Sequence, residues 1–163
     1  MPKGVEVRLL SRAPMLSLRK FAPNDIGQAL EISRASFAEP WPKSEFEKYL
    51  DGSFVAEEDA VPNGRQDKIS GFVVGKTVGS QGILKLIAVS PNYRGKGVAK
   101  SLMERIFSYF TEKNIKEVVA HSRLHNKEGC SFLKSFGFEK TETIKNYYRD
   151  GEDAYLMVKK LDG

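Results

Sequence analysis

A glycine-rich basic turn is the segment whose residue types and spacing most directly suggest chemistry. It reads Arg94-Gly95-Lys96-Gly97-Val98-Ala99 and follows the short apolar run Leu86-Ile87-Ala88-Val89. Glycines let the backbone approach a ligand closely, and the first amides of a helix have no partner within the helix. Those amides, the helix dipole and two basic side chains together favour an anion. The turn therefore predicts a phosphate-binding site between a buried strand and a helix.

The spacing of the glycines excludes two common nucleotide-binding motifs. The turn lacks the Gly-x-x-x-x-Gly-Lys-Ser/Thr pattern of a nucleoside-triphosphate loop. Lys100 stands where the dinucleotide-binding pattern Gly-x-Gly-x-x-Gly requires its last glycine. Taken alone, the turn is equally compatible with a basic turn that has two permissive glycines and no ligand.

Hydrophobic periodicity predicts the elements that would hold this turn in place. The helix after the turn, residues 97–113, has an apolar residue at every fourth position from Val98 to Phe110, which gives one core-facing stripe. The expected strands cover residues 16–21, 53–58, 69–77, 83–89, 118–121, 138–144 and 154–158. The other expected helices are 25–37 with an Asn24 cap, 44–50 with a Ser44 cap, and 126–136 ended by Gly137.

This order of elements predicts an α+β domain with a mixed, largely antiparallel central sheet and helices on both faces. The domain would span residues 15–163, and a basic extension, residues 1–14, would precede it. Pro40 and Pro42 forbid a regular continuation of the first helix, so the segment from Phe37 to Pro42 is expected to be a loop.

Composition narrows the classes of partner. The 163-residue chain has a net charge of +5 and a pI near 9.2, which suits an acidic ligand, a nucleic acid or the ribosome surface without selecting among them. No apolar run approaches the ~18 residues that cross a bilayer, and no secretion signal is recognised. The lone Cys130 excludes an internal disulfide, and no Cys/His cluster has metal-site spacing. We therefore expect a cytoplasmic protein with no metal, no membrane partner and no specific nucleic acid.

Four segments, in order, resemble the GNAT superfamily of N-acetyltransferases. The run from Val89 to Ala99 is similar to the acetyl-CoA signature of that family, Arg/Gln-x-x-Gly-x-Gly/Ala. The segment His121 to Asn126 resembles the next strand of the family and its following Asn, and Phe136-Gly137-Phe138 resembles its helix-closing Gly-Phe. The segment Tyr147 to Met157 closely resembles the C-terminal part of protein N-terminal acetyltransferases. These include the ribosomal-protein alanine acetyltransferases and the NatA-type catalytic subunit with its archaeal relatives. The resemblance covers residues 16–161.

The resemblance implies transfer of an acetyl group from acetyl-CoA to the α-amino group of a protein N-terminus. The amides of residues 94–99 would hold the pyrophosphate of the coenzyme. The edge of the strand formed by Ile87, Ala88 and Val89 would pair with the pantetheine arm, and a bulge there would aim a backbone N–H at the thioester oxygen. Val89 is the candidate donor. Asn126 matches an Asn that contacts the coenzyme arm, and it would equally serve as a helix N-cap.

An ammonium substrate must lose a proton before it attacks, and two residues are candidate bases. His121 stands where related enzymes carry Glu or His, and an imidazole titrates near neutral pH. Glu39 lies near the place where NatA-type enzymes carry a substrate-contacting Glu. As purely structural residues, His121 would be a hydrogen-bonded histidine at a strand end, and Glu39 would be a solvated loop carboxylate.

Aromatic residues complete the expected peptide site. In the family a tyrosine pair, here Tyr147 and Tyr148, clamps the peptide N-terminus. Phe37 and Trp41 would wall the same groove, although all four rings are also compatible with ordinary core or surface positions. Leu133 departs from many members of the family, in which a Tyr at this position is the general acid for the CoA thiolate. Water or one of the tyrosine pair would then replace that acid, or the thiolate would leave without one.

The sequence thus predicts an acetyl-CoA-dependent N-acetyltransferase that acts on ribosomal-protein N-termini or other nascent chains. Two alternatives stay open at this point. One is a GNAT enzyme for a small amine such as a polyamine, an amino acid or an antibiotic. The other is a non-catalytic acyl-CoA-binding or ribosome-binding module, which the loss of the tyrosine acid at Leu133 would suit.

Overall fold

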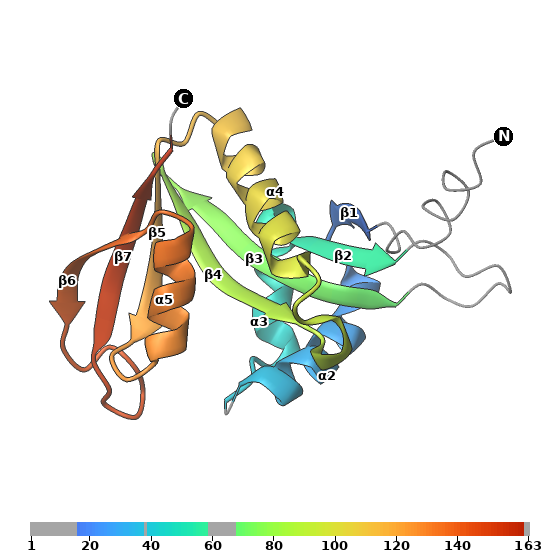
Figure 1. The fold of residues 1–163 in the computed structure, drawn as a ribbon, viewed down its shortest axis with the longest axis horizontal. Helices are drawn as coiled ribbons and strands as arrows, with labels where there is room; N and C mark the ends of the chain where they lie inside the picture. Colours follow the sequence, from blue (N-terminus) through green and yellow to red (C-terminus); the bar gives the residue numbers. More distant parts are fainter. Residues whose placement is uncertain (1–15, 38, 59–67, 162–163) are drawn as a thin grey trace, which may run out of the picture.

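In the part of the chain that the structure describes, seven strands form one sheet around which the helices are arranged (Figure 1). The computed structural model describes residues 16–37, 39–58 and 68–161. The predicted extension, residues 1–14, and the turn expected near residues 62–64 lie outside these ranges. Within them, no helix is long and apolar enough to cross a membrane, and no three His, Cys, Asp or Glu side chains are grouped as metal ligands.

The strand order is β1-β2-β3-β4-β5-β7-β6, in which β4 and β5 are parallel and the other described neighbours are antiparallel. This arrangement confirms the predicted mixed, largely antiparallel sheet. The strands are β1 (Leu16–Lys20), β2 (Phe54–Glu58), β3 (Ile69–Val78), β4 (Gln81–Val89), β5 (Glu117–Arg123), β6 (Glu139–Ile144) and β7 (Ala154–Lys160).

The helices lie close to the predicted positions, but two predicted caps are wrong. Asn24 lies inside a 3-10 turn, and Ser44 lies inside a helix that begins one residue earlier, after the extended Pro42. Asp25 is instead the N-cap residue of α2, but its carboxylate does not bond to that helix and accepts the Ala22 N–H at the start of η1. The helices are α2 (Ile26–Ser36), α3 (Lys43–Glu47), α4 (Val98–Glu112) and α5 (Lys127–Ser135), and the 3-10 turns are η1 (Pro23–Asp25), η2 (Leu50–Gly52) and η3 (Pro91–Tyr93).

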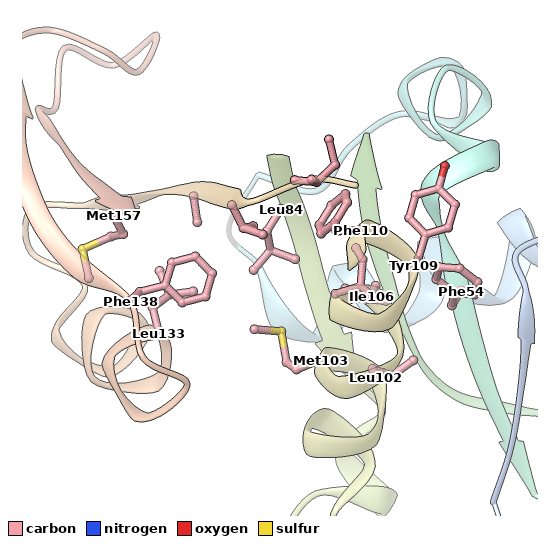
Figure 2. Close-up of a cluster of buried hydrophobic side chains, with 14 of the residues drawn as sticks. Phe54, Leu84, Leu102, Met103, Ile106, Tyr109, Phe110, Leu133, Phe138 and Met157 are labelled. Carbon is pink, nitrogen blue, oxygen red and sulfur yellow. The ribbon is translucent and has the colours of Figure 1, made fainter. Parts of the chain in front are cut away.

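Apolar clusters cover both faces of the sheet. The larger one packs α4 and α5 against one face, and Figure 2 shows its centre, where Ile106 and Phe110 of α4 lie near Leu84 of β4. The smaller cluster packs α2 and α3 against the opposite face. The predicted stripe on α4 is confirmed, since its members are buried: Val98, Leu102, Ile106 and Phe110. We refer to these two faces as the α4 face and the α2 face.

A register shift in β4 turns its side chains from one face to the other. Val74 pairs with Leu86 and Gly75 pairs with Leu84, so Lys85 is an extra residue that β3 does not match. Leu84 consequently packs on the α4 face, whereas Leu86 packs on the α2 face. Such a bulge bends and twists its strand. It lies ahead of the segment from Ile87 to Val89 at which the sequence predicts one.

Beyond this bulge β4 and β5 separate. Their parallel pairing runs from Gln81 and Glu117 to Leu84 and Ala120, and the last residues of both strands lie beyond it. Figure 1 shows the two strands side by side where they begin and apart where they end. The sheet is thereby divided into a β1–β4 part and a β5–β7–β6 part that are joined at one end.

A buried carboxylate fixes the chain between β1 and α2. The Asp25 side chain is 4% exposed, and it accepts two hydrogen bonds from the Arg19 guanidinium, at 2.8 and 2.9 Å. Burial raises the pKa of Asp25, but the Arg19 guanidinium and the Ala22 N–H outweigh burial and hold this pKa below its ordinary value. The stabilisation from this carboxylate is therefore present at neutral pH and is lost as the pH falls through the depressed pKa.

The substitution Asp25→Ala should lower the free energy of unfolding by about 2 kcal/mol, because it leaves buried donors without an acceptor. The control Glu45→Ala removes the carboxylate that pairs with the exposed Lys48 and should change the same quantity by less than ~0.5 kcal/mol. Urea denaturation at pH 7 measures both. Equal effects of the two substitutions would show that Asp25 has no special structural role.

Candidate active site

A pocket of about 240 Å³ lies at the start of α4, where the sequence predicts a phosphate site. Gly95 and Gly97 have φ angles of +77° and +83°, a conformation that side chains disfavour, and a Cβ on either would meet no atom within 4 Å. The backbone conformation therefore requires these glycines, and the space above them is open to a ligand. The pocket is lined by Val89, Tyr93, Arg94, Gly95, Gly97, Val98, Ala99 and Lys100.

The N-terminus of α4 supplies hydrogen-bond donors to this pocket. Gly97 is the N-cap residue, and it has no side chain that could accept from the first turn. The N–H groups of Val98 and Ala99, which line the pocket, have no acceptor within the helix. The positive end of the helix dipole adds to their attraction for an anion, so the arrangement suits a phosphate or pyrophosphate group.

The basic side chains around the turn take different positions. Arg94 lines the pocket and also donates to the Val89 carbonyl at 3.2 Å and to the Ser36 hydroxyl at 3.1 Å, which ties the turn to the end of α2. The Lys96 ammonium lies 5.6 Å from the centre of the Tyr93 ring. Sequence reasoning did not select Lys100, which lines the pocket from the first turn of α4.

The backbone of β4 presents hydrogen-bonding groups to the side on which β5 diverges. The Ser90 N–H donates to the Ser70 carbonyl at 2.8 Å, which fixes the alternation of the β3–β4 ladder. By this alternation, Ala88 directs its N–H and C=O toward β3, whereas Ile87 and Val89 direct theirs away from β3. Of the three residues that the sequence predicts for pantetheine pairing, Ala88 thus uses its backbone groups within the sheet. Ile87 and Val89 present their backbone N–H and C=O groups at the edge of β4 from which β5 diverges.

His121 lies on β5, one residue beyond the last residue that pairs with β4. Its ring stacks on Tyr147, with ring centres 4.5 Å apart and planes 9° apart. Burial and the positive charge of Lys85 lower the pKa of His121 below its ordinary value of 6.5. The imidazole is therefore neutral at pH 7, which is the form that can accept a proton.

An ion-pair network anchors the loop between β6 and β7. Arg123, at the end of β5, donates to Asp150 and Glu152, each at 2.8 Å. Glu152 also accepts from the backbone N–H of His125 at 3.1 Å. These donors, Arg123 foremost, lower the pKa of Glu152 to about 2, so the network stays charged across the physiological pH range.

This loop carries the tyrosine pair, whose two rings have different surroundings. Tyr147 is 42% exposed and rests one face on His121. Tyr148 is half-buried, 4.0 Å from the Arg123 guanidinium and edge-on to Tyr147. Burial foremost raises the pKa of Tyr148 to about 12, so its hydroxyl keeps its proton at neutral pH. The structure thus brings His121 and both tyrosines together at the end of β5.

The loop before α3 contributes mainly to packing. Trp41 contacts Phe46 and Tyr49, with ring centres 5.5 Å apart in each case, and Phe37 packs against the same cluster on the α2 face. Glu39 is exposed, and within the described ranges no hydrogen bond or ion pair holds it. Its role as a base or as a substrate contact therefore stays a prediction.

Three residues of α5 and its start have structural roles. The Asn126 side chain accepts from the Gly129 N–H at 2.9 Å, which confirms the N-cap interpretation; the coenzyme contact stays a prediction. Leu133 is buried on the α4 face, so this position offers no proton. The Cys130 thiol donates to the Ser122 hydroxyl at 3.2 Å.

The sequence does not indicate that two lysines gather at Tyr49, one of which, Lys85, acts on His121. The ammonium groups of Lys76 on β3 and Lys85 on β4 lie 5.4 and 5.6 Å from the centre of the Tyr49 ring. The only sequence signal is that Lys85 interrupts an apolar run. That signal does not reveal a bulge, because the run of residues 83–89 still reads as one continuous strand.

The chain belongs to the acetyltransferase (GNAT) family, whose model matches residues 26–138. The family predicted from the sequence is thereby confirmed. The matched residues include the anion pocket, the point where β4 and β5 diverge, and His121.

Individual relatives within the family include enzymes named for N-terminal acetylation. An N-alpha-acetyltransferase of Saccharolobus solfataricus is 33% identical over 155 residues, covering 89% of this chain and 93% of the relative. The ribosomal protein bS18-alanine N-acetyltransferase of Escherichia coli is 26% identical over 152 residues, covering 88% and 97%. Among solved structures, Ard1 from Thermoplasma volcanium superimposes with a TM-score of 0.80 at 26% identity, covering 91% of this chain and 99% of that one.

NMR titration of the imidazole protons should give His121 a pKa below 6.5, because burial and the Lys85 charge both disfavour the imidazolium. Lys85→Met removes that charge and should move this pKa upward, whereas Lys140→Met, on the edge strand β6, should leave it unchanged. A pKa of 6.5 or higher in the unaltered protein would contradict the described environment of His121.

Proposed function

We propose that the chain transfers the acetyl group of acetyl-CoA to the α-amino group of a protein N-terminus. One observation carries the proposal: the diverging edges of β4 and β5 connect the anion pocket of α4 to the cluster of His121 and Tyr147. An elongated coenzyme with a phosphate at one end and a thioester at the other fits such an arrangement. The names of the relatives support the same activity.

The residues of the pocket suit the coenzyme. The amides at the start of α4, with Arg94 and Lys100, would hold the pyrophosphate. The pantetheine arm has amide groups of its own, and it would pair with the backbone groups that Ile87 and Val89 direct away from β3. Asn126 would contact the arm from the start of α5 through its side-chain N–H groups, because its oxygen caps the helix.

The reaction would be a direct attack of the amine on the thioester carbonyl. The nitrogen forms a bond to the acetyl carbon, the carbonyl oxygen gains negative charge, and the N–H of Val89 or of Ile87 would stabilise that charge. The carbon–sulfur bond then breaks, and the CoA thiolate leaves. Acetyl-CoA supplies the activated acyl group, and the described side chains would move protons and orient the amine.

His121 would accept the proton of the incoming ammonium, directly or through water, because its neutral form prevails at pH 7. Glu39 would contact the amine from the loop before α3. Leu133 leaves the thiolate without the tyrosine acid, so water or Tyr148, whose hydroxyl is protonated at neutral pH, would supply that proton.

The names of the relatives and the exposed tyrosine support a protein N-terminus as the substrate. Tyr147 presents one free face beside His121, a surface against which a peptide backbone can lie. We propose ribosomal proteins and other nascent chains in the cytoplasm as substrates, with Phe37 and Trp41 along the path of the peptide. The enzyme would associate with the negatively charged ribosome surface through its own net positive charge.

Incubation with acetyl-CoA and peptides of varied first residue should release free CoA and yield peptides acetylated at the α-nitrogen, as mapped by fragmentation mass spectrometry. Peptides with a blocked α-amine should be inert, since no nucleophile remains. Release of CoA with polyamines, antibiotics or free amino acids but with no peptide would show a small-amine enzyme instead. Release with none of them would overturn acetyl transfer.

His121→Ala should lower kcat by about 10²-fold or more, and Glu39→Ala by about tenfold, because each removes a group proposed to receive or hold the amine proton. The control is His125→Ala, whose side chain is 85% exposed and which should stay within about twofold of the unaltered protein. Steady-state kinetics at saturating acetyl-CoA measures all three. If neither of the first two changes kcat, the assignment of the base is wrong.

Gly97→Ala should raise the KM for acetyl-CoA by about tenfold or more, because an alanine at a φ of +83° distorts the turn that presents the α4 amides. Gly79→Ala is the matched control, since Gly79 also has a positive φ and open surroundings but lies in the β3–β4 hairpin. It should lose a similar amount of stability and keep its KM. Equal KM values for the two variants would remove this turn from coenzyme binding.

A further inference from the structure

The α2 face carries two lysines that converge on one tyrosine beside the proposed reaction centre. The ammonium groups of Lys76 and Lys85 lie 5.4 and 5.6 Å from the centre of the Tyr49 ring. Lys85 is the bulge residue of β4, and its charge acts on His121. Burial and, to a smaller extent, the neighbouring Tyr49 hydroxyl raise the pKa of Tyr147 above its ordinary value. We call Tyr49, Lys76 and Lys85 the lysine pair site.

The lysine pair site has no acidic partner among the described residues. Two carboxylates close to Tyr49 in the chain are engaged elsewhere: Asp51 pairs with Lys20 at 3.1 Å, and Glu45 pairs with Lys48 at 2.8 Å. No ion pair that the described ranges contain includes Lys76 or Lys85. Two ammonium groups held at one ring repel each other, and the tyrosine face offsets this only in part. A bound carboxylate would remove the repulsion.

We infer that the lysine pair site binds an acidic side chain, Asp or Glu, at the first or second residue of the substrate peptide. This inference rests on the proposed function. An α-amine placed at His121 lies beside Lys85, so a carboxylate one or two side chains away is within reach of the ammonium groups. The same positive charge disfavours the ammonium form of the amine and thus favours the form that attacks.

The coenzyme is a poorer occupant of this site. Its anion pocket begins at Val89, four residues beyond Lys85, which is about 13 Å along an extended strand. Tyr49 packs with the cluster on the α2 face, whereas Val89 packs on the α4 face. The phosphates and the lysine pair site are therefore separated both along β4 and across the sheet. The lysines thus lie on the side from which the peptide, and not the coenzyme, would approach.

The test measures acetylation of paired peptides in which one residue carries either a carboxylate or the matching neutral amide. The pairs are Asp against Asn and Glu against Gln, placed at residue one, two or three. The unaltered protein should show a kcat/KM about tenfold higher for the acidic member at residue one or two, in low salt, and little difference at residue three. Lys85→Met and Lys76→Met should each bring this ratio close to one. Lys85→Arg should keep it, because the charge is retained.

Lys140→Met is the matched control, since the Lys140 ammonium also lies over a tyrosine, at 4.4 Å from the centre of the Tyr155 ring, but belongs to β6. It should keep the full preference for acidic peptides. Active enzyme with equal rates for acidic and amide peptides, or a preference that survives both methionine substitutions, would overturn the inference and leave the proposed function intact. Absence of peptide acetylation with any sequence would overturn both.

Discussion

The structure depends on the place where β4 stops pairing with β5. Pairing ends at Leu84 and Ala120, and Lys85 is inserted at that point. The insertion reverses the face on which the later side chains of β4 lie, and no residue of β5 pairs with β4 beyond it. With it, the sheet keeps its hydrogen bonds to β3 and leaves the other edge of β4 free over its last residues. In the proposed reaction this free edge is where acetyl-CoA and the amine would meet between the two strands.

The two faces of the sheet carry different parts of the candidate active site. The α4 face holds the larger core and, at the start of α4, the pocket whose amides favour an anion. The α2 face carries His121, which alternates with the buried Ala120, together with Tyr49 and the lysine pair. The coenzyme and the amine would approach from different faces. Arg123 keeps the β6–β7 loop, and with it the tyrosine pair, close to the end of β5.

The sequence was sufficient for features that depend on local pattern. The α4 stripe, the Gly97 turn, the mixed sheet and the family all follow from spacing and motif, and the structure and the comparisons agree. It was insufficient where distant segments meet. No local pattern distinguishes Asn24 from Asp25 as a cap, because the choice depends on Arg19. Lys85 likewise reads as one residue of a strand, since its bulge exists only relative to β3. The stacking of His121 on Tyr147 joins β5 to the loop between β6 and β7, two segments that no local pattern connects.

A crystal structure of the chain with a covalent CoA–peptide bisubstrate analogue tests the central claim most directly. The pantetheine arm should lie between β4 and β5, with the pyrophosphate at the amides of Val98 and Ala99. The carbonyl oxygen of the acetyl linker should accept a hydrogen bond from the N–H of Ile87 or Val89, and the peptide nitrogen should lie on the side of His121. An analogue bound with its linker away from this edge, or β4 and β5 paired along their full length, would contradict the account.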